Sequence, residues 1–437
     1  MNTAKSISCP QSATHGFTAT AGLLGFMVAT AILRIAHPFG DNLIHSVLFI
    51  IGVTAGFIFL VDLSWQKVHL RPSTGLDFSY DDPSWSRTLT KFIGLLGSMG
   101  FIALLYWLFP EYHNKFFGPF YEMLRLILPL WLVLAIPYFF LIDRKMREPC
   151  DGYWHMGMLV LFRWNAVDNR MLGQHILSWL IKGYFFSMMF VLTCMDLSRF
   201  FEFDFGRLTA YKYWVVFIYD YLYFIDVALV TMGYLMAFRI TDTHLRSAEP
   251  TMLGWVVTLI CYEPFGGFIF SRFLAYKTGF GWGTWLDNRL DSTPILMMIW
   301  GSAILFFSAI YAWSTISFGA RFSNLTHRGI ITNGPYRWTK HPSYVAKNIS
   351  WWLISVPFVS PGTPDENLRL CLLLLGVNFV YIMRAKTEEW HLSRDPDYVQ
   401  YALWMEQHGI FRFVKHIPVL RYLSYRPPAQ SAAAVPT

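Results

Sequence analysis

The sequence has little charge and few cysteines. Only 14% of its 437 residues are Asp, Glu, Lys or Arg, whereas a soluble domain normally carries about 25%. The five cysteines lie far apart, and none forms a Cys-x-x-Cys pair or a Cys/His pattern with the spacing of metal ligands. A disulfide framework and a metal site are therefore not expected. No run of Lys and Arg stands out, which argues against nucleic-acid binding.

Hydrophobic residues take the place of charge. They make up 54% of the chain, and 18% of all residues are aromatic. No single soluble core can bury so much apolar surface, so the composition predicts an all-α, polytopic transmembrane protein with about ten spans. The apolar runs cover residues 17–37, 43–63, 92–109, 119–142, 176–194, 213–238, 251–270, 294–318, 345–360 and 367–384. The run at 345–360 is short and contains Pro357, which is typical of half a helical hairpin.

The positive residues are distributed unevenly among the loops. Lys and Arg are concentrated in the loops after the even-numbered runs and in the C-terminal tail. Because positive loops stay on the cytoplasmic side, this pattern predicts that both termini and the even loops are cytosolic. The net charge of +7 agrees with loops that face anionic lipid. No small-residue cleavage site follows the first run, which predicts a retained span.

We divide the chain into three parts. Residues 1–290 form an N-terminal membrane region whose role the sequence does not indicate. Residues 291–426 form a membrane core, and residues 427–437 have the composition of a disordered tail. Within the core, Asp395 before Pro396 has the pattern of a helix N-cap, and apolar residues then recur at helical spacing. This pattern predicts an amphipathic helix on the cytosolic surface.

The first motif with chemical potential is Gly334–Tyr344, with the sequence GPYRWTKHPSY. Its Gly-Pro start indicates a turn, and Pro342 can open the following helix. Free backbone N–H groups near Ser343 would then receive a carboxylate or another anion. Taken alone, this stretch is explained as well by an ordinary juxtamembrane turn.

The second motif is Arg384–Leu392, with the sequence RAKTEEWHL. Glu388 follows Arg384 by four residues, so the two side chains can share a helix face. A glutamate pair, here Glu388 and Glu389, can bind an ammonium or sulfonium group at a membrane surface. A solvated helix end explains this stretch equally well by itself. The apolar hairpin between the motifs, however, returns the chain to the same membrane face, where both can form one site.

The two motifs together resemble those of the membrane methyltransferases that include isoprenylcysteine carboxyl methyltransferase and the phospholipid methyltransferases. Those enzymes carry the pattern G-P-Y-x-x-x-R-H-P-x-Y-x-G, then a hydrophobic hairpin and R-x-x-x-E-E-x-x-L. The matching residues here are Gly334, Pro335, Tyr336, His341, Pro342, Tyr344, Arg384, Glu388, Glu389 and Leu392. The resemblance covers roughly residues 295–420.

The resemblance implies S-adenosylmethionine as cofactor and a lipid or lipidated acceptor, methylated on a carboxylate or an amine. It implies cofactor contacts from Tyr336, Lys340, His341, Tyr344, Glu388 and Glu389. It implies catalytic roles for Arg384 and Glu388. Two residues depart from the pattern. Lys340 replaces an Arg, and a lysine lacks the bidentate geometry of the guanidinium. Ala346 replaces a Gly, which narrows the approach of the cofactor to the backbone.

Two other functions remain open. NADPH-dependent sterol-type reductases have a similar Arg-His-Pro-Asn-Tyr loop, but their later motif contains Asp and Lys-Tyr-Gly, so the glutamate pair favours the methyltransferase. A transporter or lipid-binding protein would explain the charged residues within apolar runs, since such charges are costly and often functional. These residues are Arg125, Lys182, Asp220, Asp226 and Glu263. A further polar cluster predicted to border the site contains Arg239, Asp242, His244 and Arg246.

Overall fold

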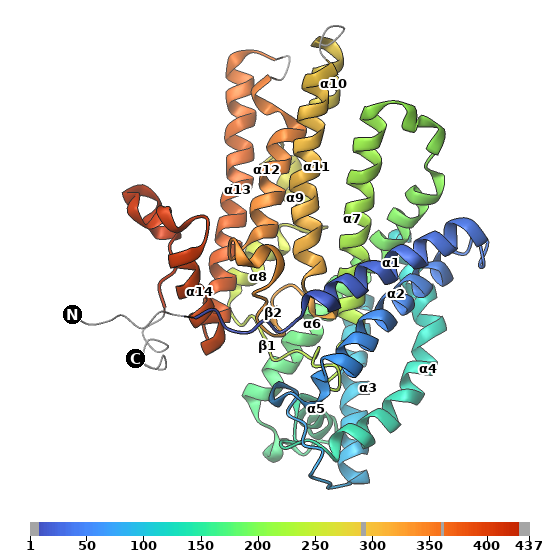
Figure 1. Cartoon of the computed structure of the whole chain (residues 1–437). Coiled ribbons are helices and arrows are strands. Elements are labelled where there is room, and N and C mark those ends of the chain that lie inside the picture. The colour runs from blue at the N-terminus through green and yellow to red at the C-terminus, as the bar shows by residue number, and fades with distance from the viewer. Residues whose placement is uncertain (1–7, 290–293, 360–361, 428–437) are drawn as a thin grey trace.

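The computed structural model describes residues 8–289, 294–359 and 362–427. Helices dominate this part of the chain, and one short antiparallel ribbon pairs β1 (Ser247–Ala248) with β2 (Thr326–His327) (Figure 1). The α-helices are α1 (Gly16–Ala36), α2 (Leu43–Leu60), α3 (Trp85–Leu108), α4 (Gly118–Asp143), α5 (Gly152–Val160), α6 (Asn169–Glu202), α7 (Tyr211–Leu235), α8 (Met252–Leu259), α9 (Phe265–Arg272), α10 (Trp282–Arg289), α11 (Pro294–Ile316), α12 (Pro342–Ser355), α13 (Pro364–Leu392) and α14 (Pro396–His408).

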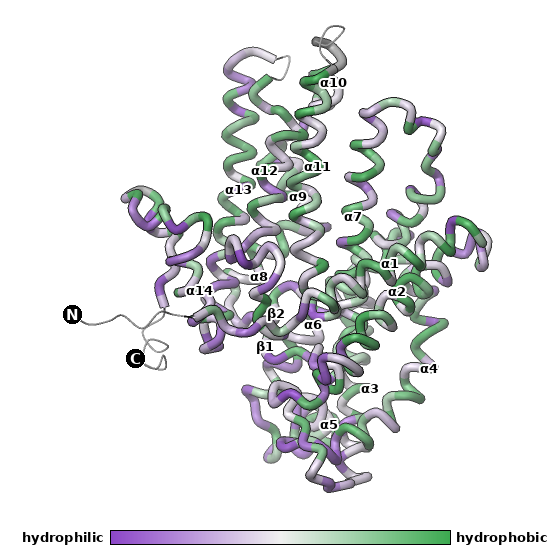
Figure 2. Tube along the Cα trace, viewed as in Figure 1, coloured by the Kyte–Doolittle hydropathy of each residue, from purple (hydrophilic) through white to green (hydrophobic). Residues whose placement is uncertain are grey.

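Eight helices within the described ranges are long and apolar enough to cross a membrane. They correspond to eight of the ten predicted runs, so the prediction of a helical membrane protein is confirmed in this coarser form. Hydrophobic residues follow α4, α11 and α13, whereas hydrophilic residues gather around α5 and α14 (Figure 2). This distribution is the one expected for helices that face lipid and loops that face water.

The prediction of one continuous span at 251–270 is wrong. The structure forms two short helices there, α8 and α9, which are separated at residues 260–264. Pro264 lacks a backbone N–H and stands just before α9, so it ends one helix and begins another. The short run at 345–360 forms α12, which ends at Val356 in a left-handed conformation with φ of 37°. Pro357 follows directly and prevents the helix from continuing.

Loops after the even-numbered predicted runs meet on one side of the molecule. The loop after α2 pairs with the loop after α4 through a bridge between Leu76 and Met146. Arg239, after α7, donates to the backbone carbonyl of Thr74 at 3.1 Å. The N-terminal segment joins them, since Ala13 N–H donates to the carbonyl of Ile330 at 2.8 Å. This gathering agrees with the single side that the charge pattern assigns to these loops.

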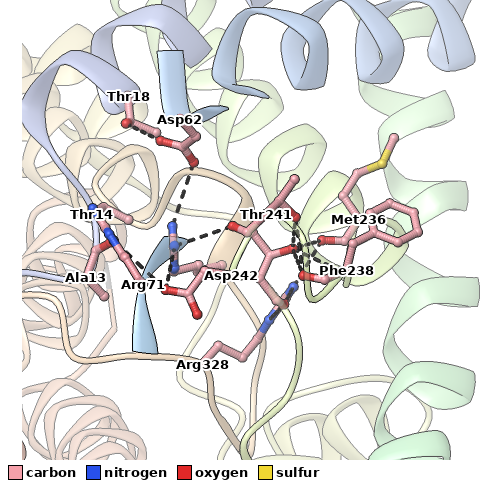
Figure 3. A network of polar contacts seen from close by, with 12 residues as sticks. Ala13, Thr14, Thr18, Asp62, Arg71, Met236, Phe238, Thr241, Asp242 and Arg328 are labelled. Carbon is pink, nitrogen blue, oxygen red and sulfur yellow. Dashed lines mark hydrogen bonds and ion pairs between the residues drawn. The ribbon is translucent and has the colours of Figure 1, made fainter. Parts of the chain in front are cut away.

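A buried ion cluster fixes where three of these loops meet. Arg321, just after α11, is 1% exposed and lies 3.3 Å from Asp242 and 3.8 Å from Asp62. Thr18 donates to Asp62 at 2.6 Å, and Arg71 approaches Asp242 at 3.9 Å. Figure 3 shows these carboxylates and their partners converging from separate segments. The charges are therefore removed from water but compensated by one another.

Arg328 adds a second polar tie beside this cluster. Its guanidinium donates to the backbone carbonyls of Thr243 at 2.6 Å, Gly233 at 2.7 Å and Phe322 at 3.0 Å. Burial, and after it repulsion from Arg321, lowers the pKa of Arg328 to about 9. The side chain therefore stays protonated at neutral pH. It satisfies carbonyls at the end of α7 that would otherwise lack donors.

The predicted parts of the chain pack together. α7 packs against α11, and β1 pairs with β2, so contacts cross the predicted boundary between residues 290 and 291. That boundary, and residues 428–437 of the predicted tail, lie outside the described residues. The three-part division stays a prediction.

Replacing Arg321 by Leu should destabilise the protein strongly, because Asp62 and Asp242 would keep buried charges without a cation. Removing one partner of such a cluster typically costs about 3–5 kcal/mol. The measurement is thermal unfolding in detergent. The matched control is Arg207→Leu, whose pair with Asp204 is about two-thirds exposed on both sides and contributes little. Equal melting temperatures for the two variants would contradict a structural role for the cluster.

Candidate active site

The first motif folds into a turn followed directly by α12. Gly334 has φ of +55°, and an added Cβ there would meet the Ser317 hydroxyl, so both conformation and space require glycine. Residues Gly334–Arg337 form one turn of 3₁₀-helix, and α12 begins at Pro342. Burial raises the pKa of Tyr336, so its phenol is neutral at physiological pH. The side chains that follow the turn reach the end of α13, where Lys340 and His341 contact Glu389.

The α12–α13 hairpin aligns the two motifs by polar contacts along its length. Trp352 donates to the Asn378 side chain at 2.8 Å, and Asn378 in turn donates to Asn348. Near the end of the hairpin, the Tyr344 hydroxyl donates to Glu388 at 2.8 Å. The expected convergence of the two motifs is therefore seen in the structure.

The two glutamates have different environments. Glu389 is buried and lies 2.8 Å from Lys340, 2.8 Å from Lys386 and 3.3 Å from the Nε2 atom of His341. The side chain of Glu388 is 41% exposed and lines the internal cavity. Glu389 therefore holds the loop and helix together, while Glu388 has a carboxylate available to a ligand.

Lys340 has a structural explanation in these contacts. Its ammonium bridges Glu389 on α13 and Glu406 on α14, at 2.8 and 3.3 Å. A point charge on a flexible stem suits two carboxylates on different helices. Ala346 is buried in α12 and does not belong to the cavity lining, so its methyl group does not narrow the cavity directly.

Arg384 lies in a cage of aromatic rings. Its guanidinium carbon is 5.1 Å from the ring centre of Tyr344, 5.4 Å from Tyr262 and 5.9 Å from Tyr381. Its Nη2 donates to the Asn324 side chain at 2.6 Å. Within the described ranges no carboxylate comes within ion-pair distance of it. The cage stabilises the cation without neutralising it.

The cavity also contains residues that the motifs did not indicate. Tyr262 comes from the turn after α8, far away in sequence, and only the fold brings it to Arg384. Lys347 lies over the ring of Tyr311 at 5.1 Å, and Tyr311 donates to Asp226 at 2.6 Å. The intramembrane charge of Asp226 was the available sequence signal. Glu263 is another of the charged residues within apolar runs. It accepts from the Gly267 N–H at 3.1 Å in the first turn of α9.

The C-terminal segment packs against both motifs. Tyr401 on α14 donates to the carbonyl of Tyr336 at 2.6 Å, and Lys386 donates to the carbonyl of Leu423 at 2.7 Å. The Tyr425 N–H donates to Glu406 at 2.8 Å. The cavity measures about 90 Å³, below the roughly 300–1,000 Å³ of small-molecule sites.

The cavity gathers six of the predicted site residues, while Glu389 lies beside it. The six are Tyr336, Lys340, His341, Tyr344, Arg384 and Glu388. Such a cavity can pair a ligand cation with Glu388 and a ligand anion with Arg384.

Comparison with known proteins agrees with the motifs. Residues 294–394 match the sequence model of the isoprenylcysteine carboxyl methyltransferase (ICMT) family. The matched segment begins at α11 and ends just after α13, so it contains both motifs. No match to a curated protein or to a solved structure was found. The resemblance to the isoprenylcysteine carboxyl methyltransferase family is thereby confirmed over residues 294–394.

Proposed function

We propose that the protein is a membrane-embedded, S-adenosylmethionine-dependent methyltransferase that acts on a lipid or lipidated acceptor. One observation carries the proposal. Within the family segment, Glu388 offers a partly exposed carboxylate and Arg384 an unneutralised guanidinium to the same cavity. The amino-acid end of S-adenosylmethionine carries an ammonium and a carboxylate, so the two side chains complement it. The family match favours this function over the reductase and the transporter.

The residues of the site would divide the work of binding. Glu388 would pair with the ammonium and Arg384 with the carboxylate of the cofactor or of the acceptor. The rings of Tyr262, Tyr344 and Tyr381 present faces that attract cations, which also suits a sulfonium. When bound, the cofactor supplies an electrophilic methyl group. The chain then has to align the acceptor with that group and exclude water.

The acceptor decides whether a base is needed. A carboxylate acceptor can attack without losing a proton. An amine acceptor must first be deprotonated, and either Glu388 or His341 is placed at the cavity to take that proton. Because the cavity is small, we propose that its walls move apart to admit the cofactor.

We further propose that this site faces the cytosol, where the soluble cofactor is available. The charge-rich loops, the N-terminal segment and α14 lie on the side of the two motifs. Gln400 on α14 donates to the carbonyl of Ser8 at 2.8 Å, which ties the C-terminal helix to the N-terminal segment.

Changing Glu388 to Gln should weaken binding of S-adenosylmethionine by roughly 10–100-fold, the equivalent of one lost charge-assisted hydrogen bond. Calorimetric titration of purified protein in detergent measures this change. Glu366→Gln is the matched control, since Glu366 caps the opposite end of α13. Unchanged affinity in Glu388→Gln would refute the assigned role. Binding of NADPH without binding of S-adenosylmethionine would refute the proposed function.

Glu389→Gln should have a different effect, since Lys386 loses its counter-charge and Lys340 keeps only Glu406. We expect a lower melting temperature for Glu389→Gln and an unchanged one for Glu388→Gln. A stability loss confined to Glu388→Gln would reverse the two roles.

A reporter that is active only in the cytosol should be active when fused after Thr437, because the positive loops predict a cytosolic C-terminus. The same reporter inserted after Lys115, in the loop between α3 and α4, should be inactive. Activity at Lys115 and none at Thr437 would invert the proposed orientation.

A further inference from the structure

A second and much larger cavity lies beside the candidate site. It measures about 1,050 Å³ and is bounded by α3, α4, α5, α6, the loop after α7 and the start of α14. Most of these elements precede the family segment. The ribbon of β1 and β2 separates the two cavities together with His391, which contacts both. Its volume is at the upper end of the range for small-molecule sites.

Two helices form facing walls of different character. Along each helix the lining residues recur at i, i+3, i+4, i+7, i+8 and i+11, which places them on one face. The α4 wall is apolar and aromatic, and consists of Trp131, Leu134, Ala135, Tyr138, Phe139 and Ile142. The α6 wall is mostly polar, and consists of Met171, Gln174, His175, Ser178, Trp179 and Lys182. A ligand between them meets an apolar surface on one side and polar groups on the other.

The carboxylates of the cavity are already engaged by the protein. Asp143 and Asp151 lie 2.7 and 3.5 Å from the ammonium of Lys91. Asp168 accepts from the first N–H groups of α6, and Asp395 lies 3.1 Å from His327. Asp143 and Asp151 are thus neutralised by Lys91, and none of the four carboxylates lies within ion-pair distance of Lys182 in the described part of the chain.

Among the described residues, Lys182 and His244 line the cavity and make no ion pair; Arg170 and Arg394 also lack one, but they are exposed. In the described part of the chain, Lys182 makes no ion pair or hydrogen bond; its ammonium lies 5.6 Å from the ring centre of Trp179. The Nδ1 atom of His244 is buried without a hydrogen-bond partner. Such groups are costly to bury unless a ligand supplies the missing hydrogen bond or counter-charge.

We infer that this cavity binds a single-chain amphiphile with an anionic head, whose carboxylate or phosphate pairs with Lys182 while its chain lies along the apolar wall of α4. The inference concerns binding and does not depend on methyl transfer. The sequence singled out Lys182 and His244, and the candidate site does not use them. The inference gives both residues a common ligand.

The cavity favours a lipid over a soluble nucleotide. Leu134 lines the cavity and is 54% exposed. Only 17% of the most apolar window of the α4 span is buried, which places this helix at the periphery of the membrane region. The α4 wall therefore lies between the cavity and the lipid, which is the phase that holds single-chain amphiphiles.

Calorimetric titration of the full-length protein in nonionic detergent tests the inference. Palmitate and palmitoyl lysophosphatidate should bind, and comparing them tells a carboxylate from a phosphate head. Hexadecanol, with the same chain and no charge, should bind at least about tenfold more weakly. In Lys182→Met the affinity for the acids should fall to that for the alcohol. Lys115→Met, at an exposed loop, should behave as the unaltered protein.

Ala135→Trp gives a second test, since it fills the apolar wall without touching a charge. It should weaken binding of acid and alcohol alike by tenfold or more. Equal affinity for palmitate and hexadecanol in the unaltered protein would overturn the inference. So would competition between palmitate and a soluble nucleotide, or unchanged palmitate binding in both Lys182→Met and Ala135→Trp.

Discussion

The burial of Arg321 between Asp62 and Asp242 is the constraint on which the rest of the arrangement depends. Helices in lipid gain little from hydrophobic attraction to one another, because the lipid is equally apolar. Polar contacts between loops must then set how the helical hairpins meet. Arg321 follows α11, Asp62 follows α2, and Asp242 follows α7. Fixing these three points also fixes the loop that continues from Arg321 into the first motif.

Much of the fold was predictable because length and hydropathy dominate membrane helices. Eight apolar runs became long helices, and the Asp395-Pro396 pattern does begin α14. The run at 251–270 has the hydropathy of one span, with Glu263-Pro264 as a kink within it. The structure separates the run into α8 and α9 instead, because Pro264 lacks the N–H that a continuous helix needs.

The site was predictable in its members and not in their division of labour. Adjacent residues on a helix point about 100° apart, so one of two neighbouring glutamates must face the cavity, but a sequence does not tell which. The two lysines around Glu389 decide this: Lys340 comes from the loop before α12, and Lys386 from α13 itself. The aromatic cage of Arg384 depends likewise on Tyr262, which no spacing rule connects to the motif. The family segment thus supplies the charged groups, while the preceding helices supply part of their surroundings.

Several contacts between the C-terminal segment and the two motifs involve main-chain atoms. Lys386 donates to the carbonyl of Leu423, and Tyr401 donates to the carbonyl of Tyr336. The Ile410 N–H donates to the carbonyl of Trp338. Every residue has a backbone carbonyl, so these contacts depend on where the backbone lies and not on which side chain the residue carries. A substitution at Ile410 or Leu423 therefore leaves these two main-chain bonds available. An insertion or deletion between the two residues would displace one of the bonds.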